Sequence, residues 1–371
     1  MHVGYSAIFQ NPDDQMTDYE VYQNELRLAE MAEPLGFESI WSVEHHFTDY
    51  TMCPNVAQFL SYMAGKTTTA RLGSMVIVLP WHDPMRAAEQ ISMLDNISGG
   101  RMILGLGRGL GRVEFDGFRV DMNESRPIFV EKAEMVLSGL ENGYCEYDGT
   151  YVQQPRRDIR PVPFKSFRGR TYAAAVSPES ARIMAKLGVG LLIVPQKPWD
   201  DVQREIGEYR EIFLSENSCE PPPPLVAGWT VVHEDEERAA ELAVQYIGKY
   251  YHTVLKHYEF SSNHLKTTKG YEYYGALTKY LDKRGADGAA ADFAMLHPWG
   301  TPEQVIEKIM NIHEMVGNNG YMAVLSFSGM PYDEAERNMR LFADKVLPAL
   351  KASGIAPPTF EAPQGAYAAT A

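Results

Sequence analysis

Glu44, His45 and His46 are consecutive in the sequence and combine one carboxylate with two imidazoles. Such side chains accept and donate protons near neutral pH, so they could serve general acid–base chemistry. Successive residues of an extended chain point to opposite sides, so at most one of the two histidines faces a given cavity, and the pair is a poor metal site. Residue type alone leaves a structural role equally open, with one histidine capping a strand and the other packed in the core.

A second chemical signal is the loop 107–112, with the order Gly-Arg-Gly-Leu-Gly-Arg. Glycines let a flat ligand approach the backbone closely, and the guanidinium of Arg108 can bind a phosphate group through two hydrogen bonds. The order of the glycines differs from the dinucleotide-binding fingerprint. A tight turn with a solvated arginine is the alternative interpretation.

Ser177 and Ser180 offer a further anion site, because they lie where an expected strand leads into a helix that begins at Pro178. Hydroxyl groups and free amides of a first helical turn bind phosphate at the positive end of the helix dipole. A simple capping motif is the alternative. Two such features at strand ends favour one monophosphate ligand more strongly than either does alone.

The elements that position these residues alternate between strand and helix patterns. Short apolar runs predict strands at 3–9, 37–43, 70–80, 101–106, 171–175, 190–194, 225–232 and 321–326. Amphipathic segments separate most of them, and such alternation implies a parallel sheet with right-handed crossovers. We therefore predict an α/β fold, a (β/α)8 barrel, whose active site lies at the C-terminal ends of the strands.

We predict that residues 1–352 form this single barrel domain. Residues 258–297 carry few regularly spaced apolar positions and many Tyr, Lys, Gly and Asp, so we expect a lid insertion there. Residues 144–170 are expected to form a small hairpin excursion. The Pro-, Ala- and Gly-rich tail 353–371 is expected to be disordered.

Composition limits the partners and the compartment. The 371 residues carry a formal net charge of −15, which disfavours nucleic acid and anionic membranes as partners. No run approaches the roughly 20 apolar residues of a membrane-spanning helix, and residues 1–9 lack the features of a signal peptide. The three cysteines are scattered, so neither a disulfide framework nor a cysteine zinc site is expected. We expect a cytoplasmic protein.

Several segments resemble the bacterial luciferase-like flavin monooxygenases, above all the catalytic luciferase subunit, in the same order and at compatible spacing. They are Glu-His-His-Phe-Thr at 44–48, Ile-Val-Leu-Pro at 77–80, Arg-Gly-Leu at 108–110, Phe-Arg-Val-Asp-Met-Asn-Glu-Ser-Arg at 118–126 and Gly-Thr-Pro-Glu at 300–303. The resemblance covers nearly the whole chain apart from the tail. It implies a (β/α)8 flavoprotein that uses FMN, in reduced form supplied by a separate NAD(P)H:flavin reductase, to activate dioxygen.

The resemblance also assigns site residues. It implies that His45 is catalytic, with the acidic Glu44 and Glu114 near the flavin, and that Tyr250 lines the substrate pocket. The implied cofactor site comprises Ser74, Met75, Val76, Gly107, Arg108, Val176, Ser177 and Ser180, with a non-prolyl cis peptide at Met75–Val76 and the phosphate on Arg108, Ser177 and Ser180. The family pattern differs at Gly107, Gly111 and Val176, where luciferase has a cysteine, a pocket tyrosine and a glutamate, so light emission and a long-chain aldehyde substrate do not follow.

The leading hypothesis is a two-component, FMN-dependent monooxygenase that oxidises a small hydrophobic substrate through a flavin C4a-peroxide, as a homodimer without a metal. A deazaflavin-dependent dehydrogenase of the same superfamily would transfer hydride and use no oxygen. A non-catalytic flavin-binding relative would turn over nothing. From a different class, a barrel hydrolase could use Glu44 and Glu114 as a carboxylate pair.

Overall fold

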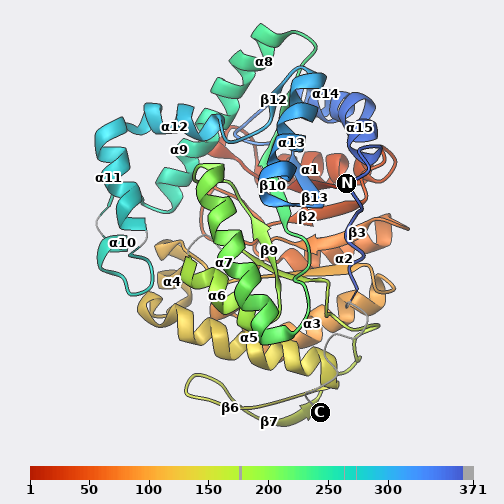
Figure 1. Ribbon diagram of the computed structural model, residues 1–371, viewed down its shortest axis with the longest axis vertical. Coiled ribbons are helices and arrows are strands. Elements are labelled where there is room, and N and C mark those ends of the chain that lie inside the picture. The colour runs from red at the N-terminus through yellow and green to blue at the C-terminus, as the bar shows by residue number, and fades with distance from the viewer. Residues whose placement is uncertain (175–177, 263, 273, 362–371) are drawn as a thin grey trace.

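The computed structural model describes residues 1–174, 178–262, 264–272 and 274–361. Within these residues eight parallel strands form a closed barrel, in the order β3-β2-β1-β13-β10-β9-β8-β5, and pairing of β3 with β5 closes it. The short strand β4 also pairs with β5 and continues the third strand. Helices surround the strands in Figure 1. The predicted (β/α)8 barrel is confirmed.

The barrel strands are buried on both faces, which explains their apolar and small residues. They are β1 (His2–Ala7), β2 (Ser39–Ser42), β3 (Arg71–Ser74), β4 (Ile77–Val78), β5 (Met102–Gly107), β8 (Thr171–Ala174), β9 (Gly190–Ile193), β10 (Leu225–Trp229) and β13 (Gly320–Val324). Outside the barrel, β6 (Tyr144–Asp148) and β7 (Gln153–Asp158) form the expected hairpin, and β11 (Val231–Val232) pairs with β12 (Trp299–Gly300).

The helices begin at recognisable caps, such as the capping boxes of Thr17 and Thr301 and the Asp83 cap before Pro84. They are α1 (Asp18–Ala32), α2 (Val56–Lys66), α3 (Pro84–Ile97), α4 (Arg112–Phe118), α5 (Ser125–Asn142), α6 (Pro178–Lys186), α7 (Trp199–Asn217), α8 (Glu236–Leu242), α9 (Gly248–His257), α10 (His264–Thr267), α11 (Tyr274–Arg284), α12 (Ala286–Ala294), α13 (Pro302–Val316), α14 (Tyr332–Leu341) and α15 (Leu347–Lys351). Single turns are η1 (Pro12–Asp14), η2 (Leu79–Trp81) and η3 (Met122–Glu124), and π-helical turns are η4 (Ala243–Ile247) and η5 (Phe342–Val346).

The third strand differs from the continuous run expected at 70–80. It breaks after Ser74 at a cis peptide bond between Met75 and Val76, and resumes as β4. The non-prolyl cis bond is where the resemblance implied it. The loop after β5 leads directly into helix α4, which starts at Arg112.

Residues 258–297 are more ordered and more apolar than expected. They contain α10, α11 and α12, which lie beside α9 at one side of the barrel in Figure 1. Phe260, Leu265, Tyr271, Leu281 and Phe293 are buried there. The tyrosines of this segment were interpreted as polar, whereas Tyr271 and Tyr274 are buried in the core.

The expectation of a disordered tail is wrong for residues 353–361. Phe360 is 2% exposed and packs in the barrel interior with Trp41 and Tyr172. Its ring lies 5.1 Å from the ring of His2 and 4.8 Å from the guanidinium of Arg71. One aromatic anchor therefore orders a segment whose composition is otherwise typical of disorder. Residues 362–371 lie outside the described part.

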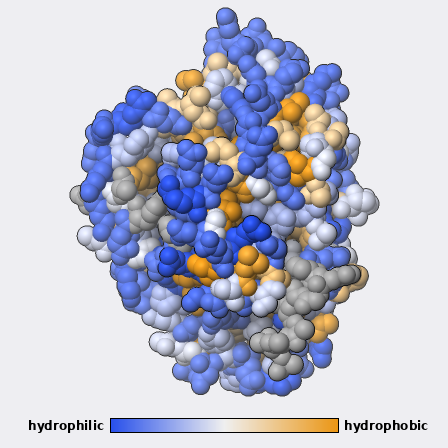
Figure 2. Space-filling model, in the orientation of Figure 1, coloured by the Kyte–Doolittle hydropathy of each residue, from blue (hydrophilic) through white to orange (hydrophobic). Residues whose placement is uncertain are grey.

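No helix among the described residues is both long and apolar enough to span a bilayer. Hydrophilic residues cover most of the face seen in Figure 2, and hydrophobic atoms show mainly near its centre.

Candidate active site

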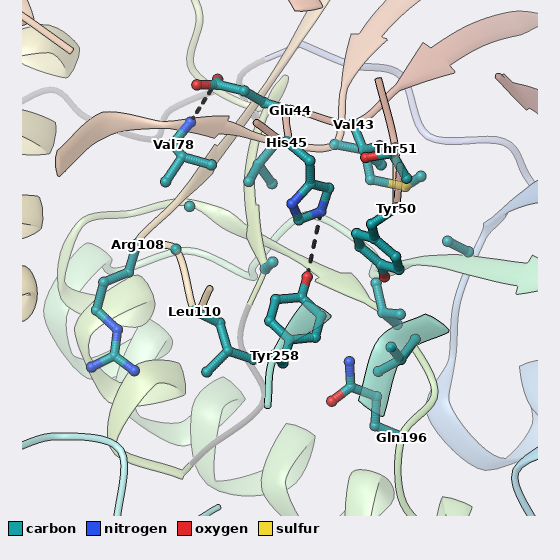
Figure 3. A pocket seen from close by; sticks show the side chains of 18 of the residues that line it. Val43, Glu44, His45, Tyr50, Thr51, Val78, Arg108, Leu110, Gln196 and Tyr258 are labelled. Carbon is teal, nitrogen blue, oxygen red and sulfur yellow. Dashed lines mark hydrogen bonds between the residues drawn. The ribbon is translucent and has the colours of Figure 1, made fainter. Parts of the chain in front are cut away.

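A cavity lies at the C-terminal ends of the barrel strands. Its wall combines residues that follow β2, β3 and β5 with residues from α9 and from segment 258–297. In Figure 3, His45, Arg108, Tyr50, Tyr258 and Gln196 surround a common space. Aromatic and aliphatic side chains make up most of the remaining wall, among them Leu110, Phe129, Trp229, Tyr250, Phe260 and Phe293.

His45 presents one ring nitrogen to this cavity and the other to Glu114. Its Nδ1 lies 2.9 Å from Oε1 of Glu114, and its Nε2 lies 3.4 Å from the hydroxyl of Tyr258 (Figure 3). Burial alone would raise the pKa of Glu114, but the neighbouring imidazole of His45, with its hydrogen bond, and the imidazole of His257 outweigh it, so the pKa is lowered and the carboxylate is ionised. An ionised Glu114 accepts the proton of Nδ1, which leaves the lone pair of Nε2 facing the cavity. His45 is therefore arranged as a base.

Glu44 has a different role from the catalytic one assigned by sequence. Its carboxylate accepts hydrogen bonds from the Nε2 atoms of His46 and His82, from Trp81 Nε1 and from the backbone N–H of Val78. Burial alone would raise the pKa of Glu44, but the hydrogen bonds from His46 and His82 lower it. In Figure 3 the carboxylate points away from the cavity centre toward Val78. Glu44 thus holds the segment after the cis peptide, and it does not form a free carboxylate pair with Glu114.

His46 lies on the opposite side of the strand end from His45, as the alternation of an extended chain predicts. Its ring packs against Phe118 at 4.6 Å and Phe47 at 5.6 Å between centroids. With Nε2 bound to Glu44, it is a structural histidine.

Two arginines, Arg108 and Arg126, converge at one corner of the cavity. Arg108 and Arg126 both donate to the carbonyl oxygen of Gly270, at 2.9 and 3.0 Å, and Arg126 also pairs with Glu179 on α6. The guanidinium of Arg108 lies 3.8 Å from the ring centroid of Tyr271. Burial lowers the pKa of Arg108, and no carboxylate in the described part of the chain forms an ion pair with it. This corner concentrates positive charge at the first turn of α6.

Arg126 was not assigned a role from the sequence, although it ends the segment 118–126 that carries the family resemblance. The spacing gives no direct sign that it meets Arg108, because α4 and η3 separate them along the chain. Ser180 lines the same cavity. Val176 and Ser177 lie outside the described residues.

The other cofactor residues divide into two groups. Met75, Val76 and Gly107 line the cavity, and a Cβ at Gly107 would lie 2.2 Å from Val76. Ser74 does not line the cavity: its hydroxyl exchanges hydrogen bonds with the backbone of Gly105, at 3.0 and 2.8 Å. Ser74 therefore links β3 to β5, and its assignment to the cofactor site is corrected accordingly.

Of the two residues assigned to the substrate pocket, only one lines the cavity. Tyr250 lines the cavity, and its hydroxyl lies 2.6 Å from that of Tyr50. Gly111 lies outside the cavity wall, at the N-cap of α4, where an added Cβ would be 2.7 Å from Glu114 Oε2 and 3.0 Å from His257 Nε2. Gly111 therefore leaves space for this buried pair. Neither His257 nor Tyr258 was singled out by sequence, because nothing in the helical pattern of α9 marks its last residues as parts of the site.

The arrangement fits a flavin phosphate at the Arg108–Arg126 corner. Nε of Arg126 is buried without a hydrogen-bond partner among the described residues, and Arg108 is a buried cation without a paired carboxylate. Both are the kind of group that a bound phosphate satisfies. A flat ring can approach the backbone at Gly107 because no side chain occupies that position.

His45, Glu114 and His257 place possible metal-ligand atoms within 4.8 Å of one another. However, Oε1 of Glu114 already accepts hydrogen bonds at 2.9 Å from both His45 Nδ1 and the backbone N–H of His46. These contacts are direct hydrogen bonds. The cluster is therefore arranged around shared protons.

A family model described as luciferase-like monooxygenase matches residues 1–319. The chain belongs to the luciferase-like monooxygenase family. The alkanal monooxygenase alpha chain of Photorhabdus luminescens is 26% identical over 341 residues, which cover 91% of this chain and 94% of that protein. The monooxygenase RslO1 from Streptomyces bottropensis has a similar structure, with a TM-score of 0.78, 26% identity and coverage of 94% of this chain and 99% of that one. These relationships make the chain a flavin-dependent monooxygenase of the luciferase-like type.

Two further structures share the fold of this luciferase-like chain but bind different cofactors. The oxygenating constituent of 3,6-diketocamphane monooxygenase from Pseudomonas putida, in complex with FMN, has a TM-score of 0.72 and 17% identity, over 94% of this chain and 98% of that one. An F420-dependent secondary alcohol dehydrogenase has a TM-score of 0.69 and 16% identity, with the same coverage. At these identities the likeness concerns the fold alone.

Proposed function

We propose that this luciferase-like protein uses reduced FMN and dioxygen to oxidise a small, hydrophobic organic molecule. The observation that carries the proposal is His45, whose Nδ1 is fixed by the buried Glu114 while its Nε2 faces a largely apolar cavity. When bound, reduced FMN supplies the electrons that activate dioxygen. His45 Nε2 would take up or return a proton at the reacting atoms, and Arg108 and Arg126 would hold the phosphate.

The apolar wall supports the substrate class. Tyr50, Trp229, Tyr250 and Phe293 enclose the cavity, so a substrate gains most of its binding free energy from burial of its own apolar surface. The same wall excludes water from the reacting atoms, which limits loss of the activated oxygen as hydrogen peroxide.

A separate NAD(P)H:flavin reductase is part of the proposal, since the structurally similar FMN-binding protein is described as an oxygenating constituent.

We also propose a homodimer, because the neighbouring helices α2 and α3 expose the large side chains of Tyr62, Met93 and Ile97. The cytoplasm remains the compartment we propose. Sedimentation of the purified protein tests the dimer directly.

Hydride transfer from a substrate to an oxidised deazaflavin is the second candidate, because an F420-dependent dehydrogenase shares the fold. The two functions differ in their need for oxygen. We would supply the full chain with reduced FMN from a reductase, in aerobic buffer, together with aldehydes, ketones, terpenes and alkanes, and follow products by mass. We expect a mass gain of one oxygen atom. Substrate oxidation by oxidised F420 under anaerobic conditions, without any oxygenated product from reduced FMN, would refute the proposal.

A further inference from the structure

The carboxylate of Glu114 lies between two histidines from distant parts of the chain. Its Oε1 is 2.9 Å from Nδ1 of His45 and 3.6 Å from Nε2 of His257, the last residue of α9. The side chains of Glu114 and His257 are each only 1% exposed. A single buried anion is therefore shared by one imidazole that faces the cavity and one that does not.

The second nitrogen of His257 leads away from the cavity. Its Nδ1 lies 3.0 Å from the hydroxyl of Thr48, and both residues line a separate outer cleft together with Asp49, Lys256 and Glu259. The ring of Tyr50 stacks on His257 at 4.4 Å and lines both the cavity and the cleft. A continuous row of proton-carrying groups thus passes through the wall that separates the two spaces.

The protonation states suit this row. Burial lowers the pKa of His257, so its imidazole is neutral at rest beside the ionised Glu114. With the Nδ1 proton directed to Thr48, Nε2 faces Glu114 as a lone pair, which agrees with the 3.6 Å separation and with the lack of a hydrogen-bond partner for Nε2 among the described residues. Gly111 keeps the space beside Nε2 and the carboxylate free of a side chain.

We propose that His45, Glu114 and His257 form a proton relay between the cavity and the outer cleft. A proton enters at Nε2 of His45, the Nδ1 proton of His45 passes to Oε1 of Glu114, Glu114 gives a proton to Nε2 of His257, and the Nδ1 proton of His257 leaves toward Thr48 and water. One proton enters and one leaves, and no electrons move. His257 is a positioning residue for proton transfer, since it acts on His45 only through Glu114. The proposal rests on the proposed function in taking His45 as the group that exchanges protons with bound reactants.

Such a relay would let His45 exchange protons with water while the cavity is closed. When the cavity is filled and dry, His45 cannot exchange its proton with bulk water through the cavity, yet each turnover must return it to its starting state. The route through Glu114 and His257 reaches the outer cleft without opening the cavity.

The main test compares His257→Gln with a matched control, His252→Gln, in the full chain. Glutamine at 257 keeps a polar group beside Glu114 but cannot pass a proton on. His252 lies on the same helix, its side chain is 43% exposed, and its partner is Asp287 rather than Glu114. Stopped-flow oxidation of reduced FMN by oxygen would be measured in H2O and in D2O.

We expect His257→Gln to slow the isotope-sensitive phase by at least about 10-fold, less than the roughly 10²–10⁴-fold of direct acid–base help because His45 itself is retained. Reduced FMN should bind within about twofold of wild type, and His252→Gln should react as wild type does. Imidazole added to His257→Ala should restore the rate through the outer cleft, which a purely structural role would not allow. An unchanged rate and isotope effect in His257→Gln, or no rescue by imidazole, would overturn the relay.

A second measurement separates failure of the relay from failure of the proposed function, because it needs no flavin. Glu114, His45 and Asp49 are the ionisable groups that face His257, and Tyr50 and Tyr258 stay neutral because burial raises their pKa values. Nitrogen NMR should show His45 and His257 titrating as a coupled pair in wild type, and His45 as a single group in His257→Gln. Identical His45 curves would reject the relay, as would a stoichiometric divalent metal in the purified protein. If the wild-type protein neither binds nor oxidises reduced FMN but shows coupled titration, only the flavin assignment is rejected.

Discussion

The substitution His45→Asn separates the structural role of His45 from its chemical role. Nδ1 of His45 donates to Glu114 at 2.9 Å, and the amide nitrogen of asparagine can take nearly the same position. The buried carboxylate then keeps its donor, so we expect the free energy of unfolding to change by less than about 1 kcal/mol. His45→Ala removes the donor instead, and loss of a hydrogen bond to a charged group costs about 1.5–3 kcal/mol. Both variants lack Nε2 at the cavity.

General acid–base help is worth about 10²–10⁴-fold, or roughly 3–5 kcal/mol of barrier. We therefore expect His45→Asn and His45→Ala to lose product formation by this factor, while both bind reduced FMN normally and release hydrogen peroxide in place of product. The assay measures product and peroxide per reduced FMN consumed, with urea unfolding in parallel. The reasoning fails if His45→Asn, folded as stably as wild type, keeps a near-wild-type product yield.

Further predictions concern the phosphate corner, the lid and two buried side chains. Arg108→Ala should weaken FMN binding by about 10- to 100-fold but leave the already weak riboflavin binding unchanged, and equal FMN affinities measured by calorimetry would contradict the phosphate assignment. Limited proteolysis should cut segment 258–297 in the free protein and be suppressed by reduced FMN, because Gly270 contacts both arginines. His46→Gln should keep the bond to Glu44 and most of the activity, as product yield would show. Burial raises the pKa of Glu25 to about 7 in the fold, against 4.5 as its ordinary value, so its stabilising protonated form is lost as the pH rises through 7. Glu25→Gln should therefore gain up to about 3 kcal/mol at pH 8 and little at pH 4, as measured by urea unfolding.

The barrel was predictable from the sequence because parallel strands buried on both faces leave a clear apolar signature. The expected strand at 37–43 contains β2, so the placement of His45 at a strand end followed directly. Its partner Glu114 lies 69 residues further on, and its acidic role near the flavin came from the family resemblance. Periodicity shows which face of a helix or strand is buried, but it does not show which distant element packs against that face.

The features that were missed share this cause. His257 and Arg126 are ordinary polar residues of helices until the barrel brings them to Glu114 and Arg108. The helices of segment 258–297 escaped notice because alanines and tyrosine share their buried positions with few leucines and phenylalanines, and simple apolar patterns underweight alanine and tyrosine. Phe360 was hidden for a related reason: one anchor residue orders a stretch that composition assigns to disorder.

The segment 258–297 contacts two parts of the site, His45 and Arg108. At one end, the hydroxyl of Tyr258 lies 3.4 Å from His45 Nε2, and at the other, Gly270 and Tyr271 contact Arg108. The hydroxyl of Tyr271 also donates to the carbonyl of Gly109 at 2.8 Å, so the lid and the glycine-rich loop are bonded directly. We expect a phosphate that draws Arg108 and Arg126 away from Gly270 to shift the same segment that positions Tyr258 against His45.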